Sequence, residues 1–229
     1  MNHWIKDFIN LLYPPICHIC GNSLAPHEKF ICSHCIKALP RTGYHRKPDN
    51  PMEQRFAGQF PFVSATGHFF YARDTSLSQL IQDMKYRGFR DIGKFLGELA
   101  GTELFTSGFL SEIEYIVPVP MYFLKKAKRG YNQTDYIAEG ISKVTDIPVL
   151  QALKMIRRRK TQTALTRIER LANADNLFAI KKAIDLSGKT ILIVDDICTT
   201  GTTIAAAAKT ITDSFPDSRL YLFTLGVTF

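Results

Sequence analysis

The chain has 229 residues, of which 45% are hydrophobic, and its formal net charge is +8 at pH 7. This length and composition suffice for a full hydrophobic core in one or two domains. They exclude a protein that spans the bilayer, because no segment is long and apolar enough to cross it. Nothing in the sequence resembles a secretory signal with its cleavage site, so we expect a cytoplasmic protein.

An apolar stripe opens the chain and ends at two prolines, Pro14 and Pro15. Its members recur at the spacing of one helix face and are Trp4, Ile5, Phe8, Ile9, Leu11 and Leu12. The prolines cannot continue a helix, so we expect the helix to end there. Such a stripe usually packs in a core or binds a partner, and it is too short to span a membrane.

Four of the five cysteines form two C-x-x-C pairs that are separated by eleven residues. They are Cys17, Cys20, Cys32 and Cys35. Two such pairs bring four thiolates together and predict a tetrahedral Zn²⁺ site. Because four thiolates leave no open coordination position, the predicted zinc is structural and not catalytic. His18 and His34 lie inside the pairs and are possible substitutes, but the cysteines already complete the ligand set.

Residues 41–61 are rich in proline, glycine and charge, which is typical of a linker or an irregular excursion. We therefore predict two domains. Residues 1–62 would hold the N-terminal helix, the zinc module and the linker, and residues 63–229 an enzyme-sized domain.

Strands and helices alternate from residue 63 onward, which predicts an α/β fold with a doubly wound, mostly parallel sheet. The predicted strands cover residues 63–71, 115–120, 177–180, 190–195 and 219–227. The predicted helices cover residues 76–87, 90–104, 132–144 and 204–214. Residues 150–157 form a strand or a short helix, and residues 158–176 are polar and basic, which is typical of a mobile loop.

The positive charge is concentrated in residues 125–170, which hold twelve Lys/Arg and four Asp/Glu, a balance of +8. A solvated basic face is the usual reason for such a run. Here an anion site is favoured, because the run lies just upstream of the phosphate-type motif at residues 190–203. Arg129 and Gly130 follow a strand end and could hold a pyrophosphate, although alone they would more often form a basic surface turn. The stretch that begins at Lys160 is a candidate lid over an anionic ligand. Nucleic acid is the alternative partner.

Residues 190–203 read as a buried strand, two acids, a hydroxyl-rich loop and the start of a helix. The loop consists of Thr199, Thr200, Gly201, Thr202 and Thr203. A turn of free backbone N–H groups at a helix N-terminus attracts phosphate. The acids, Asp195 and Asp196, suit vicinal hydroxyls and Mg²⁺. Each half alone would more often be a solvated strand end or an N-cap, but together they predict a ribose 5-phosphate site.

Several motifs in one order resemble the ComF family, which joins a zinc module to a type I phosphoribosyltransferase domain. These motifs are the paired cysteines and residues 84–88, 117–120, 129–133, 162–178 and 194–203. The resemblance covers nearly the whole chain. It implies Mg²⁺-dependent binding of phosphoribosylpyrophosphate (PRPP) and a role in DNA uptake during natural transformation, beside other competence proteins such as a ComFA-like helicase.

The resemblance also implies roles for single residues. Asp195 and Asp196 would hold the ribose hydroxyls and the Mg²⁺ environment, and residues 199–203 the 5-phosphate. The loop through Arg129 would hold pyrophosphate, and the loop that contains Lys160 would close over it. Two hypotheses stay open: an enzyme that transfers phosphoribose to an unknown acceptor, and a non-catalytic protein that binds single-stranded DNA.

Overall fold

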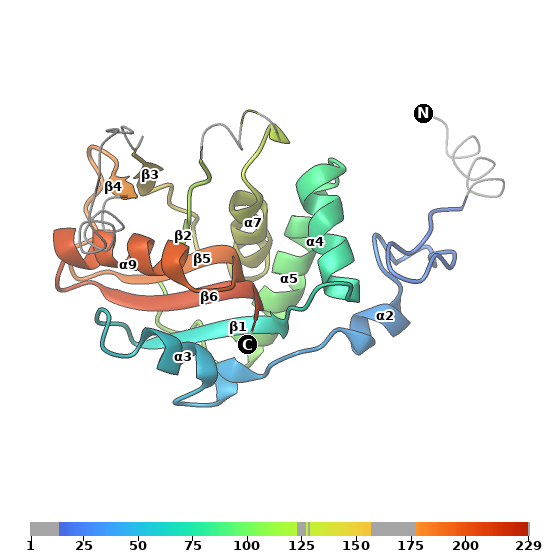
Figure 1. Cartoon of the computed structure of the whole chain (residues 1–229), viewed down its shortest axis with the longest axis horizontal. Helices are drawn as coiled ribbons and strands as arrows, with labels where there is room; N and C mark the ends of the chain where they lie inside the picture. Colours follow the sequence, from blue (N-terminus) through green and yellow to red (C-terminus); the bar gives the residue numbers. More distant parts are fainter. Residues whose placement is uncertain (1–13, 123–126, 128, 157–176, 229) are drawn as a thin grey trace, which may run out of the picture.

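The computed structural model describes residues 14–122, 127, 129–156 and 177–228 (Figure 1). The apolar stripe of residues 4–12, Lys160 and the predicted loop 158–176 lie outside the described residues. The centre of the molecule is a parallel sheet with the strand order β1-β6-β5-β2. Its strands are β1 (Ser64–Phe70), β2 (Tyr115–Pro118), β5 (Thr190–Cys198) and β6 (Arg219–Val227).

Helices cover both faces of this sheet (Figure 1). They are α3 (Pro51–Phe56), α4 (Ser76–Tyr86), α5 (Arg90–Thr106), α7 (Gln133–Thr145) and α9 (Thr202–Ser214). Along β5, Leu192 and Val194 pack with α4, α5 and α7, whereas Ile191 and Ile193 pack with α3 and α9. Alternate residues of a strand point to opposite faces, so this division confirms the predicted doubly wound sheet.

Helices α5 and α7 approach each other closely because glycines face glycines between them. A Cβ atom on Gly140 would lie 2.1 Å from the backbone oxygen of Lys94 and 2.9 Å from the Cα of Gly97. A Cβ on Gly97 would lie 2.3 Å from the backbone oxygen of Ile137. No side chain fits at either position, and the close backbone contact fixes α7 behind β2 and β5.

Two short strands do not join the parallel sheet. β3 (Leu153–Met155) pairs with β4 (Phe178–Ile180) in a separate antiparallel sheet. The expectation that residues 177–180 extend the doubly wound sheet was therefore wrong. Beyond β2, residues 148–150 add one parallel bridge, in which the N–H of Ile116 donates to the Pro148 oxygen at 2.9 Å. β5 runs three residues past its predicted end, because its pairing with β6 continues to Cys198.

Residues 41–61, for which the sequence indicated a linker or an irregular excursion, do not form a linker. The stretch contains the 3-10 helix η1 (Tyr44–Arg46) and helix α3, whose Met52 and Phe56 are buried in the core. Residues 40–42 cover the free edge of β1: the Phe70 N–H donates to the Pro40 oxygen at 2.8 Å, and the Thr42 N–H to the His68 oxygen at 3.0 Å. A covered edge cannot pair with another chain.

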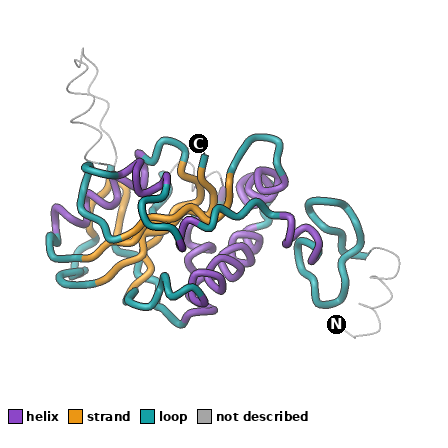
Figure 2. Tube along the Cα trace, turned by 90° about the horizontal axis from the view of Figure 1, so that it is seen from below, coloured by secondary structure: helices purple, strands orange, loops and turns teal. Residues whose placement is uncertain are grey.

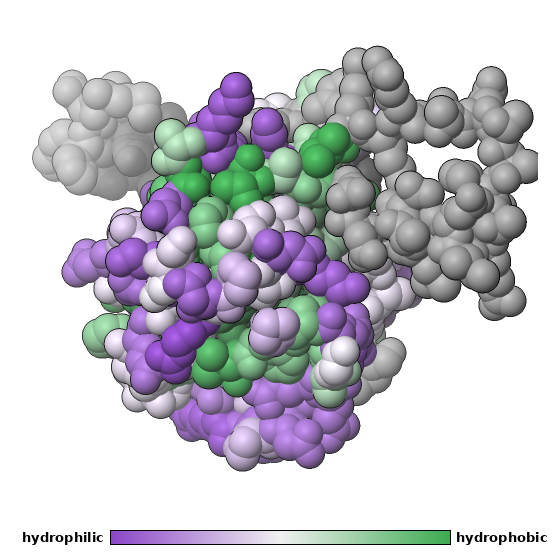
Figure 3. All heavy atoms as spheres, turned by 90° about the vertical axis from the view of Figure 1, so that its left-hand side faces the viewer, coloured by the Kyte–Doolittle hydropathy of each residue, from purple (hydrophilic) through white to green (hydrophobic). Residues whose placement is uncertain are grey.

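The cysteine module is a lobe made mostly of loops, with one short helix, α2 (Ser33–Ala38) (Figure 2). Its Ile31 is buried and belongs to the core cluster that contains α4 and α5. The face drawn in Figure 3 mixes hydrophilic and hydrophobic residues. Within the described residues, no helix has the length and apolarity needed to cross a membrane.

We expect Gly140→Ala to destabilise the protein by about 1–3 kcal/mol or more, because the new methyl group meets backbone and not a flexible side chain. Urea unfolding measures this change. Glu139→Ala, an exposed neighbour on α7, is the control and should change stability by less than about 1 kcal/mol. An unchanged midpoint for Gly140→Ala would contradict the packing described above.

Candidate functional site

The hydroxyl-rich loop lies where β5 ends and α9 begins. Its four threonines are exposed, whereas Gly201 is buried and adopts a left-handed conformation with φ of 80°. The hydroxyl oxygens of Thr200 and Thr202 lie 2.9 Å apart. The first turn of a helix leaves backbone N–H groups without intrahelical partners, so the loop and the start of α9 together have the features of an anion site.

The two acids lie just before this loop, on β5. Asp195 is only 9% exposed, and its carboxylate accepts a 2.8 Å hydrogen bond from the Asp196 N–H. Burial, reinforced by the neighbouring Asp196 carboxylate, raises the pKa of Asp195 to about 8. Asp196 forms a 2.6 Å ion pair with the Nζ of Lys85 at the end of α4. The pair therefore combines an acid that holds its proton at neutral pH with an acid that is neutralised by a cation.

A cleft of about 350 Å³ opens beside the acids. Its lining residues include Lys85, Tyr86, Arg129, Gln133, Asp195, Asp196 and Thr203. The side-chain nitrogen of Gln133 is buried and has no hydrogen-bond partner among the described residues, so a polar donor is left free at the cleft. The cleft thus offers carboxylates, cations and an amide to one ligand.

Arg129 reaches the cleft from the loop after β2. Its guanidinium lies 4.8 Å from the centre of the Tyr86 ring and donates a 3.1 Å hydrogen bond to the Tyr86 hydroxyl. The loop continues into α7 through Asn132 and Thr134, whose side chains both donate to the Val119 oxygen, at 3.2 and 2.6 Å. These bonds fix the start of α7 against the end of β2, which holds the loop close to β5.

The structure brings some of the predicted site residues together. Asp195, Asp196, Thr203 and Arg129 line the same cleft. Thr199, Thr200, Gly201 and Thr202 form the adjoining loop, and Gly130 follows Arg129 with a φ of 81°. Lys160 lies outside the described residues. The roles assigned to these residues stay predictions.

Sequence reasoning gave no role to Lys85, Tyr86 or Gln133. Lys85 and Tyr86 belong to the segment 84–88 that resembles the ComF family, but no local pattern showed that Lys85 meets Asp196. Gln133 directly follows the basic loop, and a polar residue there is ordinary for the first turn of a helix. Only the fold brings these side chains to the cleft.

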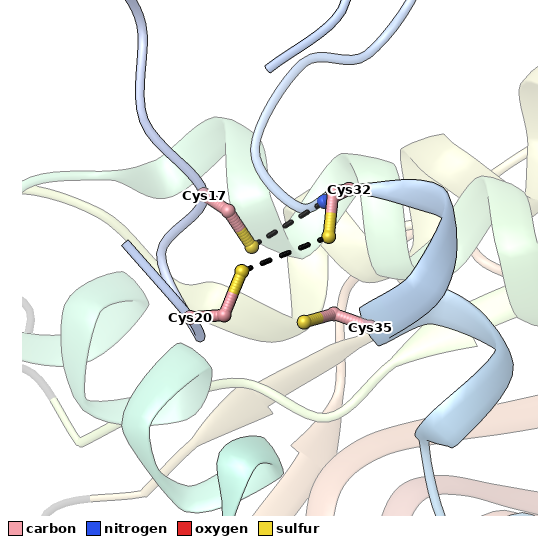
Figure 4. A group of neighbouring side chains, drawn as sticks. All are labelled: Cys17, Cys20, Cys32 and Cys35. Carbon is pink, nitrogen blue, oxygen red and sulfur yellow. Dashed lines mark hydrogen bonds between the residues drawn. The ribbon is translucent and has the colours of Figure 1, made fainter. Parts of the chain in front are cut away.

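The four paired cysteines converge on one point (Figure 4). Their sulfurs all lie within 4.8 Å of one another, and the sulfurs of Cys20 and Cys32 are 3.8 Å apart. Four sulfurs at about 2.3 Å from one zinc are separated by about 3.8 Å, whereas a disulfide needs about 2.05 Å. The geometry fits a tetrahedral metal ion and is consistent with the predicted zinc.

Backbone donors favour the ionised form of one sulfur of this cluster, that of Cys17. Burial opposes ionisation of Cys17, but hydrogen bonds from the backbone of Cys20, Cys32 and Ile19 outweigh it and lower the pKa of the thiol to about 6. The Cys32 N–H donates to the Cys17 sulfur at 3.4 Å. N–H groups directed at sulfur are the outer contacts that hold a thiolate ligand in place.

His18 does not face the cysteine sulfurs but ties the module to α4. Its Nδ1 lies 2.8 Å from a carboxylate oxygen of the buried Asp83, and the other oxygen lies 3.0 Å from Arg87. The Gln79 amide also donates to the His18 backbone oxygen. The helix that carries Lys85 is therefore bonded to the cysteine module.

Comparison with known proteins agrees with this architecture. Residues 107–214 match the family described as the phosphoribosyl transferase domain. Competence protein F of Haemophilus influenzae is 28% identical over 203 residues, which cover 85% of this chain and 77% of that protein. DNA utilization protein YhgH of Escherichia coli K12 is 28% identical over 216 residues, with 87% and 91% covered. Competence protein ComFC of Bacillus subtilis is 24% identical over 158 residues, with 68% and 61% covered.

These matches support a ComF-family protein. The resemblance found in the sequence is thus confirmed, as is the type I phosphoribosyltransferase fold with its parallel sheet. The cysteine cluster fits the small zinc module expected of a ComF-family protein. The phosphoribosyl transferase match ends at Ser214 and includes both acids and the whole hydroxyl-rich loop.

The metal assignment is tested by metal analysis of the purified chain. We expect one zinc per chain in the unmodified protein and less than about one tenth of that after combined Cys17→Ser and Cys35→Ser substitution, because two thiolates do not close the ligand set. Cys198→Ser, which changes the one cysteine outside the pairs, is the control and should retain the metal. Full zinc content in the double variant would contradict the site.

The burial of Asp195 predicts a pH-dependent stability. Because its pKa is about 8 in the folded protein against 3.8 for the ordinary side chain, the folded state binds the extra proton and loses stability as pH rises from about 4 to about 8. Asp195→Asn removes this cost. We expect its Tm to exceed that of the unmodified protein by about 5 °C at pH 8, with a smaller difference at pH 5.

Calorimetry at several pH values measures this effect. Asp213→Asn, an exposed change on α9, is the control and should give no trend with pH. A gain for Asp195→Asn that stays constant between pH 5 and pH 8 would show that Asp195 is not a buried, proton-binding group.

Proposed function

We propose that this protein binds PRPP with Mg²⁺ in the cleft at the end of β5 and transfers its phosphoribosyl group to an acceptor during DNA uptake. One observation carries the proposal: an acid pair, a helix-start anion loop and the Arg129 cation lie around one cleft. PRPP has three groups that match these parts: a diol for the acid pair, a 5-phosphate for the anion loop and a pyrophosphate for Arg129. The names of the competence and DNA-utilization relatives support the DNA-uptake context.

Each part of the ligand has a chemical counterpart in this chain. Asp195 and Asp196 would accept hydrogen bonds from the ribose hydroxyls and provide oxygen ligands for the Mg²⁺ that accompanies pyrophosphate. Residues 199–203 would bind the 5-phosphate through backbone N–H and hydroxyl groups. Arg129 would bind pyrophosphate by bidentate contact, and Gly130 would let the backbone approach it.

The transfer chemistry needs no protein nucleophile. The bond from ribose C1 to pyrophosphate breaks, pyrophosphate keeps the electron pair, and the acceptor atom bonds to C1 and loses its proton. The described residues that line the cleft include no serine or cysteine, and burial raises the pKa of the nearby Cys198 thiol. The chain's task is to orient the ligand, stabilise positive charge at C1 and exclude water.

Lys85 has a place in this scheme because it already lies in the cleft. Its ion pair with Asp196 neutralises one acid in the free protein. A ligand that contacts Asp196 competes with that pair, and a pyrophosphate group nearby offers the ammonium a new partner. The lysine would thus move from the carboxylate to the ligand without becoming an unpaired charge.

Calorimetric titration with PRPP and Mg²⁺ tests the proposal. We expect saturable one-site binding by the unmodified protein and a loss of affinity of at least about a hundredfold in the Asp195→Ala, Asp196→Ala double variant. Asp213→Asn is again the control, because it changes an exposed acid away from the cleft. No binding of PRPP, or equal binding by the double variant, would refute the proposal.

Turnover is measured separately, as pyrophosphate release in the presence of PRPP, Mg²⁺ and pools of candidate acceptors that include single-stranded DNA. Release that depends on both acids and on one acceptor pool would establish transfer. Binding without release in any pool would leave a PRPP-binding protein and remove the transfer step.

The exposed Tyr86 ring favours a second candidate, a non-catalytic protein that binds single-stranded DNA. Tyr86 is 69% exposed at the edge of the cleft, and Arg129 packs over its ring. An aromatic face beside cations suits a nucleobase and its phosphate. In this case Tyr86→Leu would weaken DNA binding, affinity would fall steeply with salt, and PRPP would compete with DNA.

A further inference from the structure

Helix α3 packs against the back of the hydroxyl-rich loop, and one of its side chains is bonded to the loop backbone. The Nη1 of Arg55 donates to the Thr199 oxygen at 2.6 Å, and its Nη2 donates to the Thr228 oxygen at 2.6 Å. Nη1 also lies 3.3 Å from the sulfur of Cys198. One guanidinium therefore joins the end of β5 to the residues that follow β6.

The direction of these bonds determines what the loop presents to a ligand. In a trans peptide the carbonyl oxygen and the next N–H point in opposite directions. Because the Thr199 carbonyl points at Arg55, the Thr200 N–H points away from α3. Thr200 itself is exposed, so in the proposed site this N–H would be free to donate to the 5-phosphate.

A close contact prevents the loop from moving back toward α3. A Cβ atom on Gly201 would lie 2.6 Å from Cε1 and 2.9 Å from Cζ of Phe56, which follows Arg55 in the sequence. Phe56 is buried and belongs to the core cluster that contains α9. The loop therefore rests directly on the ring of Phe56.

Helix α3 is itself bonded to the sheet. The side-chain oxygen of Asn50 accepts from the Met52 and Glu53 N–H groups, and its amide nitrogen donates to the Ala65 oxygen at 3.0 Å. Glu53 accepts a 2.6 Å hydrogen bond from the Ser64 hydroxyl. A capping box with bonds to β1 gives Arg55 a rigid base.

We infer that Arg55 is a positioning residue for the phosphate-binding loop, which it holds with N–H groups directed at the ligand. The inference rests on the proposed function, because it concerns the 5-phosphate of PRPP. Arg55 does not contact the ligand in this scheme. It acts by fixing one peptide plane of the loop, as preorganised donors require.

The test compares two ligands that use different parts of the site. Ribose 5-phosphate needs residues 199–203, whereas pyrophosphate with Mg²⁺ needs the Arg129 side. We expect Arg55→Met to lower the affinity for ribose 5-phosphate about tenfold and to change the affinity for pyrophosphate less than about twofold. A side chain that supports only the general fold would lower both affinities or neither.

Two further variants make the result decisive. Arg55→Lys keeps the charge and the stem but cannot bond both the Thr199 and Thr228 oxygens in the same geometry, so it should give a smaller loss for ribose 5-phosphate alone. It also serves if Arg55→Met fails to fold. Arg46→Met, which removes an exposed arginine outside the loop, is the charge control and should change neither affinity.

The outcomes separate this inference from the proposed function. If the unmodified protein binds neither PRPP nor ribose 5-phosphate, both fail. If it binds both, and if the foldable Arg55 variants bind ribose 5-phosphate as the unmodified protein does, the role of Arg55 is refuted while the PRPP site stands. Equal losses for ribose 5-phosphate and pyrophosphate also refute the positioning role.

Discussion

The site depends on the burial of β5 between β2 and β6. Both neighbours are parallel to β5: β6 pairs with it from Thr190 to Cys198, and β2 pairs with it from Ile191 to Val194. Its side chains pack against helices on both faces. A slip that carried the Asp195 carboxyl deeper into the apolar core would be unfavourable, which helps to fix the register of the strand. Asp195, Asp196 and the loop that follows them are therefore placed by the core itself.

The N-terminal part of the chain supports this strand end from two sides. On one face, α3 bonds the back of the loop through Arg55. On the other, α4 brings Lys85 to Asp196 and is bonded to the cysteine module through His18 and Asp83. The module is thus attached to the helix that neutralises the acid pair. The N-terminal part of the chain therefore helps to position the acids and the loop, although these residues belong to the larger domain.

The sequence predicted what local periodicity determines. The apolar run of β5, the helix after Gly201 and the cysteine spacing each follow from neighbouring residues. Helix α3 was not predicted, because the proline, glycine and charged residues across 41–61 indicated irregular chain and the helix-start pattern within that stretch is short. Asn50, Pro51 and Glu53 do form a helix-start pattern, and in the structure they make a capping box. No local sequence pattern could predict the pairing of Lys85 with Asp196, because the two residues are 111 positions apart (196 − 85).

The acid pair is a costly feature in the free protein. A carboxyl group as buried as Asp195 is held neutral by desolvation and by its charged neighbour, and its raised pKa means that ionisation opposes folding at neutral pH. Asparagine would fill the same space without that cost. An acid at such a position, beside a cleft with a free amide and two cations, is typical of a functional site rather than a structural one. A Mg²⁺-bound, hydroxyl-bearing ligand would offset the cost, since a cation near the pair favours its ionised form and hydroxyl donors replace the lost water. The same features that make the strand end unfavourable in the free protein therefore suit it to the ligand proposed for it.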